Sequence, residues 1–131
     1  MISPKPWYLD LITRSYQWVA WNGTVYHPAG LNPDHFPALV AHESTHLKQQ
    51  TALGRWRWLW SYMTDAHFRL CQEAEGIAVE ASRTPTILRE SLITRYSAQL
   101  SGNDYRVFGK PASPDHETAR YAILIAMEDI Q

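Results

Sequence analysis

The residues best suited to chemistry are two histidines four positions apart with a glutamate beside the first, in His42-Glu43-Ser44-Thr45-His46. Residues i and i+4 of an α-helix lie one turn apart on the same face, so two imidazoles at this spacing can converge on one metal ion. The glutamate would then project toward the open coordination position, where a carboxylate can take a proton from zinc-bound water. The spacing therefore predicts one zinc ion per chain, held by His42 and His46, with Glu43 as general base.

A third protein ligand is expected because two histidines alone make a poor zinc site. The candidates are Glu73, Glu75 and Glu80, which follow the motif on a later helical segment. The buried stripe expected for that segment consists of Leu70, Ala74, Ile77, Ala78 and Ala81. Glu73 projects nearest the edge of this stripe, whereas Glu75 and Glu80 project further away. Glu73 is the predicted ligand and Glu75 its main rival, and Gly76 would let the two helices approach closely.

The order of hairpin, loop, motif helix and downstream Glu73-Ala74-Glu75-Gly76 resembles the gluzincin metallopeptidases, most closely their minimal bacterial and phage forms. The resemblance covers about residues 16–81. It implies a zincin-like domain that hydrolyses peptide bonds in a peptide or protein substrate. Within it, His42 and His46 match zinc ligands, Glu43 matches the general base, and Glu73 matches the third ligand.

Four positions depart from related patterns. Gln49 and Ala52 stand where the metzincin motif has glycine and histidine, which excludes that family. Gly76 stands where gluzincins usually have alanine, which is a conservative change. Ile77 stands where several members have an aspartate that orients a ligand histidine, so the groups that orient the ligands must differ here.

The remaining candidates are weaker. His67 could replace a carboxylate as ligand, but a partly exposed helix histidine is the preferred interpretation, and His27 and His35 are expected to be solvated loop residues. Cys71 is expected to pack as a small apolar group and not to act as a nucleophile. Four residues are candidates for a donor that stabilises an oxyanion, and the sequence does not choose among them: Tyr62, Tyr96, Tyr105 and His116.

The elements that must position these residues are predicted to be mainly helical (α+β), in a single domain over residues 1–131. Asn22-Gly23 predicts a β-hairpin over residues 16–26, because this turn needs positive φ at both positions. A loop over residues 27–33 follows. Asn32 or Asp34 is expected to cap the motif helix, which Gly54 ends after Leu53.

Further helices are expected over the rest of the chain. One helical region covers residues 55–82, with a break near Thr64-Asp65. Thr84-Pro85 is expected to open a helix to about Leu100, and a turn over residues 101–104 follows. Ser113-Pro114 is expected to open the last helix.

Composition narrows the classes of function. The chain has 131 residues, 45% of them hydrophobic, and a net charge of −1, which fits a globular domain and argues against nucleic-acid binding driven by charge. The single cysteine excludes an internal disulfide and a zinc site of several thiolates. No signal peptide or transmembrane segment is recognisable, so an intracellular location is expected, with phage or prophage origin suggested by the resemblance.

The segment Trp56–Trp60 offers an alternative to catalysis. Tryptophans at positions 56, 58 and 60 cannot all face one way on a helix, so at least one is expected to be exposed. The alternative function is therefore a non-catalytic, zinc-stabilised module that binds a protein partner through this Trp-rich surface. Glu43 favours the enzyme, because a purely structural zinc site has no need of a carboxylate at an open position.

Overall fold

The computed structural model describes residues 1–130, and its first compact element is the predicted hairpin. Strand β2 (Val19–Trp21) pairs antiparallel with β3 (Thr24–His27). The turn residues Asn22 and Gly23 have φ values of 51° and 84°, as this type of turn requires. A third strand that the sequence did not reveal, β1 (Ile2–Pro4), pairs parallel with β3, so the strand order is β1-β3-β2.

Helix α1 (Pro37–Leu53) carries the His42-Glu43-Ser44-Thr45-His46 motif and ends at Gly54, whose φ of 95° confirms the predicted stop. Its start differs from the expectation. The Asn32 side chain caps a separate 3₁₀ helix, η2 (Pro33–His35), and Phe36 between the two has extended φ. The physical reason is Pro37, because a proline disfavours helical backbone at the residue before it.

Two helices follow in the region predicted to be helical with a break. Helix α2 (Arg55–Thr64) ends at Asp65, whose carboxylate accepts a hydrogen bond from the Phe68 backbone N–H and so caps α3 (Ala66–Ser82). The predicted break near Thr64-Asp65 is therefore confirmed.

The last two helices are α4 (Thr86–Ser101) and α5 (His116–Ile130). Thr84 does not cap α4, because its hydroxyl donates to the Glu80 carbonyl at the end of α3. Asp115 accepts a hydrogen bond from the Thr118 N–H at 2.7 Å, so α5 begins after Asp115 and not at Ser113-Pro114. Asp115 is a better cap than Ser113-Pro114, because its carboxylate reaches a free N–H in the first turn of the helix.

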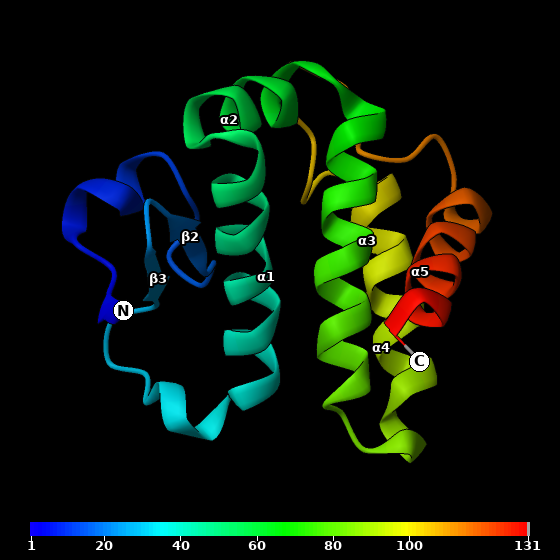
Figure 1. The fold of residues 1–131 in the computed structure, drawn as a ribbon, viewed down its shortest axis with the longest axis horizontal. Coiled ribbons are helices and arrows are strands. Elements are labelled where there is room, and N and C mark those ends of the chain that lie inside the picture. The colour runs from blue at the N-terminus through cyan, green and yellow to red at the C-terminus, as the bar shows by residue number, and fades with distance from the viewer. Residues whose placement is uncertain (131) are drawn as a thin grey trace.

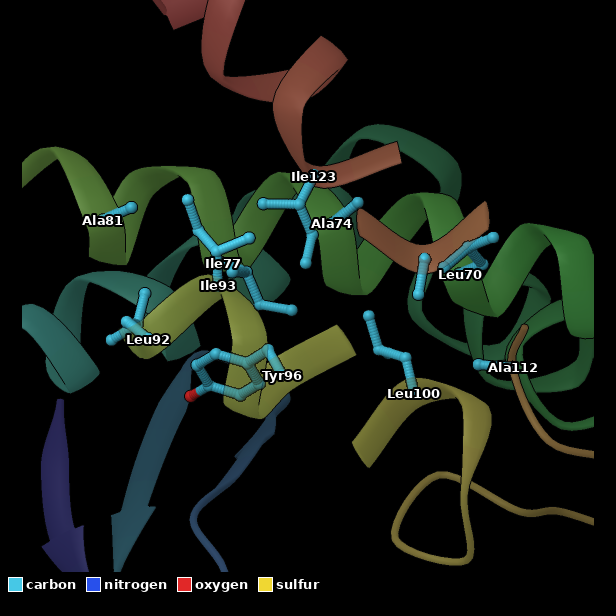
Figure 2. Packing of buried hydrophobic residues seen from close by; sticks show 11 residues of the cluster. Leu70, Ala74, Ile77, Ala81, Leu92, Ile93, Tyr96, Leu100, Ala112 and Ile123 are labelled. Carbon is cyan, nitrogen blue, oxygen red and sulfur yellow. The ribbon is translucent and has the colours of Figure 1, made fainter. Parts of the chain in front are cut away.

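The main hydrophobic core lies among α3, α4 and α5 (Figure 2). The five residues of the predicted α3 stripe are all buried, from Leu70 to Ala81. Ile93, Leu100 and Ile123 complete the centre of this core from the other two helices. Helix α3 is therefore held rigidly on one side, and its opposite side is presented to α1.

Helix α1 lies between the sheet and α3 (Figure 1). On the sheet side, the buried Gln50 amide donates to the Ala20 carbonyl at 2.8 Å and accepts from the Asn22 N–H at 3.1 Å. The other side carries the two motif histidines. Five helices and one small sheet confirm the mainly α (α+β) class, and no helix in residues 1–130 is long and apolar enough to span a membrane.

Candidate metal centre

Three predicted site residues meet between α1 and α3. His42 and His46 are buried, and so is Glu73 on the facing helix, with 2%, 5% and 4% of their surfaces exposed. The Glu73 Oε1 atom lies 3.2 Å from His42 Nε2 and 3.2 Å from His46 Nε2. One carboxylate oxygen thus faces both imidazole nitrogens.

These two distances fit ligands of a shared metal. Two atoms bound to one tetrahedral zinc at about 2.0–2.1 Å lie roughly 3.3 Å apart. Charge-assisted hydrogen bonds from an imidazolium to a carboxylate are usually shorter, about 2.7–2.9 Å. The 3.2 Å separations lie within hydrogen-bond range and also match the edge of a tetrahedral metal site.

Glu80 orients the His42 ring. The Nδ1–H of His42 donates to Glu80 Oε1 at 2.8 Å, and the Tyr96 hydroxyl donates to the same oxygen at 2.7 Å. The expectation that Glu80 projects away from the site is wrong, since only 3% of its surface is exposed. Glu80 supplies the orienting carboxylate that Ile77 cannot, two helical turns after Glu73.

Gln49 orients the His46 ring as Glu80 orients the His42 ring, but the acceptor is a neutral amide oxygen and not a carboxylate. The Gln49 Nε2 donates to the Gln72 carbonyl at 3.1 Å, which leaves its Oε1 to accept from His46 Nδ1–H at 2.9 Å. With both Nδ1 atoms occupied as donors, the Nε2 atoms of His42 and His46 are the ones presented to Glu73. This is the donor set that a divalent cation such as zinc prefers.

Glu73 is itself fixed by a phenol. Its second oxygen, Oε2, accepts a hydrogen bond of 2.6 Å from the Tyr62 hydroxyl. The Tyr62 ring stacks on Trp58 with 4.9 Å between ring centroids, and Trp58 lies 5.8 Å from the His46 ring. The buried Arg69 guanidinium donates to the Tyr62 backbone carbonyl at 2.6 Å, so Tyr62 is held from both ends.

Glu43 lies beside the two histidines, but unlike Glu73 it makes no hydrogen bond to them. A carboxylate oxygen of Glu43 and one nitrogen each of His42 and His46 lie within 4.8 Å of one another. Within residues 1–130 the Glu43 side chain is half-buried and makes no hydrogen bond to protein. Burial raises the pKa of Glu43, and the charges of the two histidines partly oppose this effect.

The charges around the histidines favour a cation. Burial lowers the pKa of His42, but hydrogen bonds to Glu73 and Glu80 outweigh burial and raise the pKa to about 10. Burial raises the pKa of Glu73, but the charge of His46 and hydrogen bonds from both histidines bring the pKa far below its usual value. A pocket that stabilises protonated imidazole in this way also stabilises a bound divalent cation.

Two of the four candidate oxyanion donors already donate hydrogen bonds to carboxylates of the centre. The hydroxyls of Tyr62 and Tyr96 donate to Glu73 and Glu80. His116 is exposed at the first position of α5. Tyr105 differs, because its half-buried phenol makes no hydrogen bond within residues 1–130, and burial and the charge of Glu73 raise its pKa well above the usual value.

Tyr105 is also held by the backbone. The Arg69 Nε donates to the Tyr105 carbonyl at 3.0 Å, and Arg69 Nη2 donates to the Lys110 carbonyl at 2.8 Å. One buried guanidinium therefore connects the loop of Tyr105 to the end of α2, where Tyr62 lies. The sequence did not identify Arg69, although an arginine among the apolar residues of the α3 stripe is an unusual residue to find there.

The structure separates the other candidates from the site. Glu75 and His35 are exposed. His27 is a buried residue of β3 and not a solvated loop residue, because strand β3 extends through it. Cys71 is exposed and not packed as an apolar group, and its Sγ lies 3.6 Å from the Nε2 of the exposed His67, one helical turn away.

No protein-family model matches the chain, and no curated protein or solved structure is significantly similar to it. The gluzincin resemblance therefore remains an expectation from the motif residues of the sequence.

Proposed function

We propose that this protein is a zinc-dependent metallopeptidase that holds one zinc ion with His42, His46 and Glu73. The observation that carries the proposal is the position of Glu73 Oε1, 3.2 Å from the Nε2 atoms of both histidines. The hydrogen bonds from both Nδ1 atoms support it, because they direct the metal-binding nitrogens toward one point. Zinc at this point would act as a Lewis acid on water and on a peptide carbonyl.

Glu43 is the proposed general base and proton carrier. Its carboxylate has no protein hydrogen-bond partner in residues 1–130, so it is available to water or substrate. The raised pKa brings it closer to the value at which a carboxylate both accepts and returns a proton. Glu43 would take a proton from the attacking water and deliver it to the leaving amine.

Tyr105 is the proposed donor to the oxyanion. Its hydroxyl makes no hydrogen bond within residues 1–130, unlike the hydroxyls of Tyr62 and Tyr96. Burial keeps this hydroxyl protonated at neutral pH, as a donor must be. Arg69 fixes the backbone of Tyr105 and would thereby fix the position of the donor.

The first experiment is elemental analysis of protein purified without a metal-chelating tag. Wild type is expected to carry about one zinc per chain, and His46→Ala is expected to lose it. His67→Ala is the matched control, since this exposed histidine lies on α3 outside the centre. Equal zinc in all three proteins, or none in wild type, would contradict the proposed centre.

Hydrolysis is then tested with Glu43→Gln. This variant is expected to retain zinc and to lose cleavage of a peptide library by at least ~100-fold. Zinc binding without any hydrolysis by wild type would favour the second function, a zinc-stabilised module that binds a protein partner. The observation that favours this second function is the exposure of Trp56 and Trp60 on α2, 66% and 71%, while Trp58 is buried.

A further inference from the structure

A loop near the N-terminus presents large apolar side chains to solvent. It contains the 3₁₀ helix η1 (Trp7–Leu11), and the exposed fractions are 74% for Trp7, 56% for Tyr8, 75% for Leu11 and 80% for Ile12. Figure 1 shows this loop at one end of the long axis of the molecule, opposite α5. Apolar residues gathered on a projecting loop indicate a contact surface and not a part of the core.

Lys5 holds this loop in a fixed shape. Its ammonium group is buried and donates to Arg14 O at 2.7 Å, Gln17 O at 2.9 Å and Thr13 Oγ1 at 3.1 Å. A lysine is buried only where its charge is satisfied, so these bonds fix the end of the loop relative to its start. The apolar side chains are therefore held outward by the structure and are not a loose tail.

The charged residues of the loop are paired, one pair within the loop and one with a residue outside it. The Asp10 carboxylate, which lies within the apolar segment, pairs with Lys5 at 3.1 Å. The Arg14 guanidinium pairs with Asp104 at 3.0 Å. The exposed surface of the loop therefore carries little free charge of either sign, and contact with a partner would not depend on charge attraction.

The size and composition of the surface favour a lipid bilayer over a protein. Four side chains of this exposure offer on the order of 500 Å², below the roughly 800 Å² that each partner contributes to a stable protein interface. Tryptophan and tyrosine are enriched at the interface of membranes, and leucine and isoleucine insert into the acyl region. We propose that Trp7, Tyr8, Leu11 and Ile12 insert into the surface of a lipid bilayer, with the loop held ready by Lys5.

The test uses the full-length protein and phosphatidylcholine vesicles, with binding measured by co-sedimentation. Wild type is expected to bind, and the double substitution Leu11→Asp with Ile12→Asp is expected to lower the partition coefficient at least ~10-fold. The matched control is Ile87→Asp with Leu88→Asp, on α4, where 88% and 54% of the side chains are exposed. This control is expected to bind like wild type, and added salt is expected to leave wild-type binding unchanged.

Several outcomes would overturn the proposal. One is that wild type is found only in the supernatant, and another is that both double variants lose binding equally. A concentration-dependent dimer that disappears in the Leu11→Asp, Ile12→Asp variant would assign the surface to a second copy of the chain. Equal melting temperatures of the variants and wild type establish that the substitutions leave the fold intact, and none of these readouts depends on the metal centre.

Discussion

Gly76 on α3 lies directly against the imidazole ring of His42 on α1. A Cβ atom at position 76 would lie 2.8 Å from His42 Cδ2 and 2.9 Å from His42 Nε2, closer than side-chain contacts allow. The glycine therefore permits the close approach of the two helices that brings Glu73 within reach of both histidines. The expectation of a close approach at Gly76 is confirmed, and its partner is a predicted ligand.

Gly76→Ala should displace the His42 ring and weaken zinc binding at least ~10-fold, because the ring cannot move without losing its bond to Glu80. Isothermal titration calorimetry with zinc measures the affinity. The metal-free melting temperature is the internal control, since alanine in a helix interior would stabilise by up to ~1 kcal/mol if it fitted without strain. Unchanged zinc affinity together with a raised melting temperature would refute the steric argument.

Glu80→Gln is expected to lower zinc affinity by ~10–100-fold through loss of the carboxylate that orients His42. The matched control is Glu75→Gln on the same helix, because Glu75 is exposed. Competition with a fluorescent zinc chelator provides both dissociation constants. If the two variants bind zinc equally well, Glu80 has a structural role only.

Zinc binding at pH 7 should release a proton from His42. With a pKa of about 10, His42 is protonated in the metal-free protein, and its Nε2 must lose that proton before it can bind zinc. Affinity should accordingly fall as pH decreases. Calorimetry in Pipes and Tes buffers, which differ in ionisation enthalpy and bind zinc only weakly, tests this, because a released proton adds the ionisation enthalpy of the buffer to the observed heat. Identical heats in the two buffers would mean that His42 is neutral at pH 7.

Tyr62→Phe and Tyr105→Phe should have different effects. Loss of the Tyr62 hydroxyl frees Glu73 Oε2 and is expected to lower zinc affinity several-fold, by roughly 1 kcal/mol. Loss of the Tyr105 hydroxyl is expected to leave zinc affinity unchanged and to lower kcat by ~10²-fold or more. Zinc titration and peptide hydrolysis by the same preparations separate the two roles, and a Tyr105→Phe variant with full kcat would exclude it as the donor.

Arg69→Leu should lower the free energy of unfolding by ~3–5 kcal/mol, because the carbonyls of Tyr62, Tyr105 and Lys110 lose their hydrogen-bond donor. Urea denaturation of the metal-free protein measures the change in free energy of unfolding. The control is Arg57→Leu on α2, which is exposed and should change stability by less than ~0.5 kcal/mol. A small effect at position 69 would show that water replaces the guanidinium.

Local features of the sequence determined the elements that carry the site. The Asn22-Gly23 turn, the stop at Gly54 and the break at Asp65 depend on backbone preferences and on caps within a few residues, so they could be predicted. The spacing of His42 and His46 placed both on one helix face for the same reason. Strand β1 could not be predicted, because its pairing with β3 joins residues more than twenty positions apart.

Only the tertiary structure decided which distant groups complete the centre. The apolar stripe of α3 predicts Glu80 outside the site, although seven residues rotate a helix by only about 20°, so Glu80 lies on nearly the same face as Glu73. The partners of the histidine Nδ1 atoms depend on how α1 docks on α3, and Arg69 acts on a loop more than thirty residues away. Helical periodicity fixes the direction of a side chain within its own helix, whereas packing between helices fixes what that side chain meets.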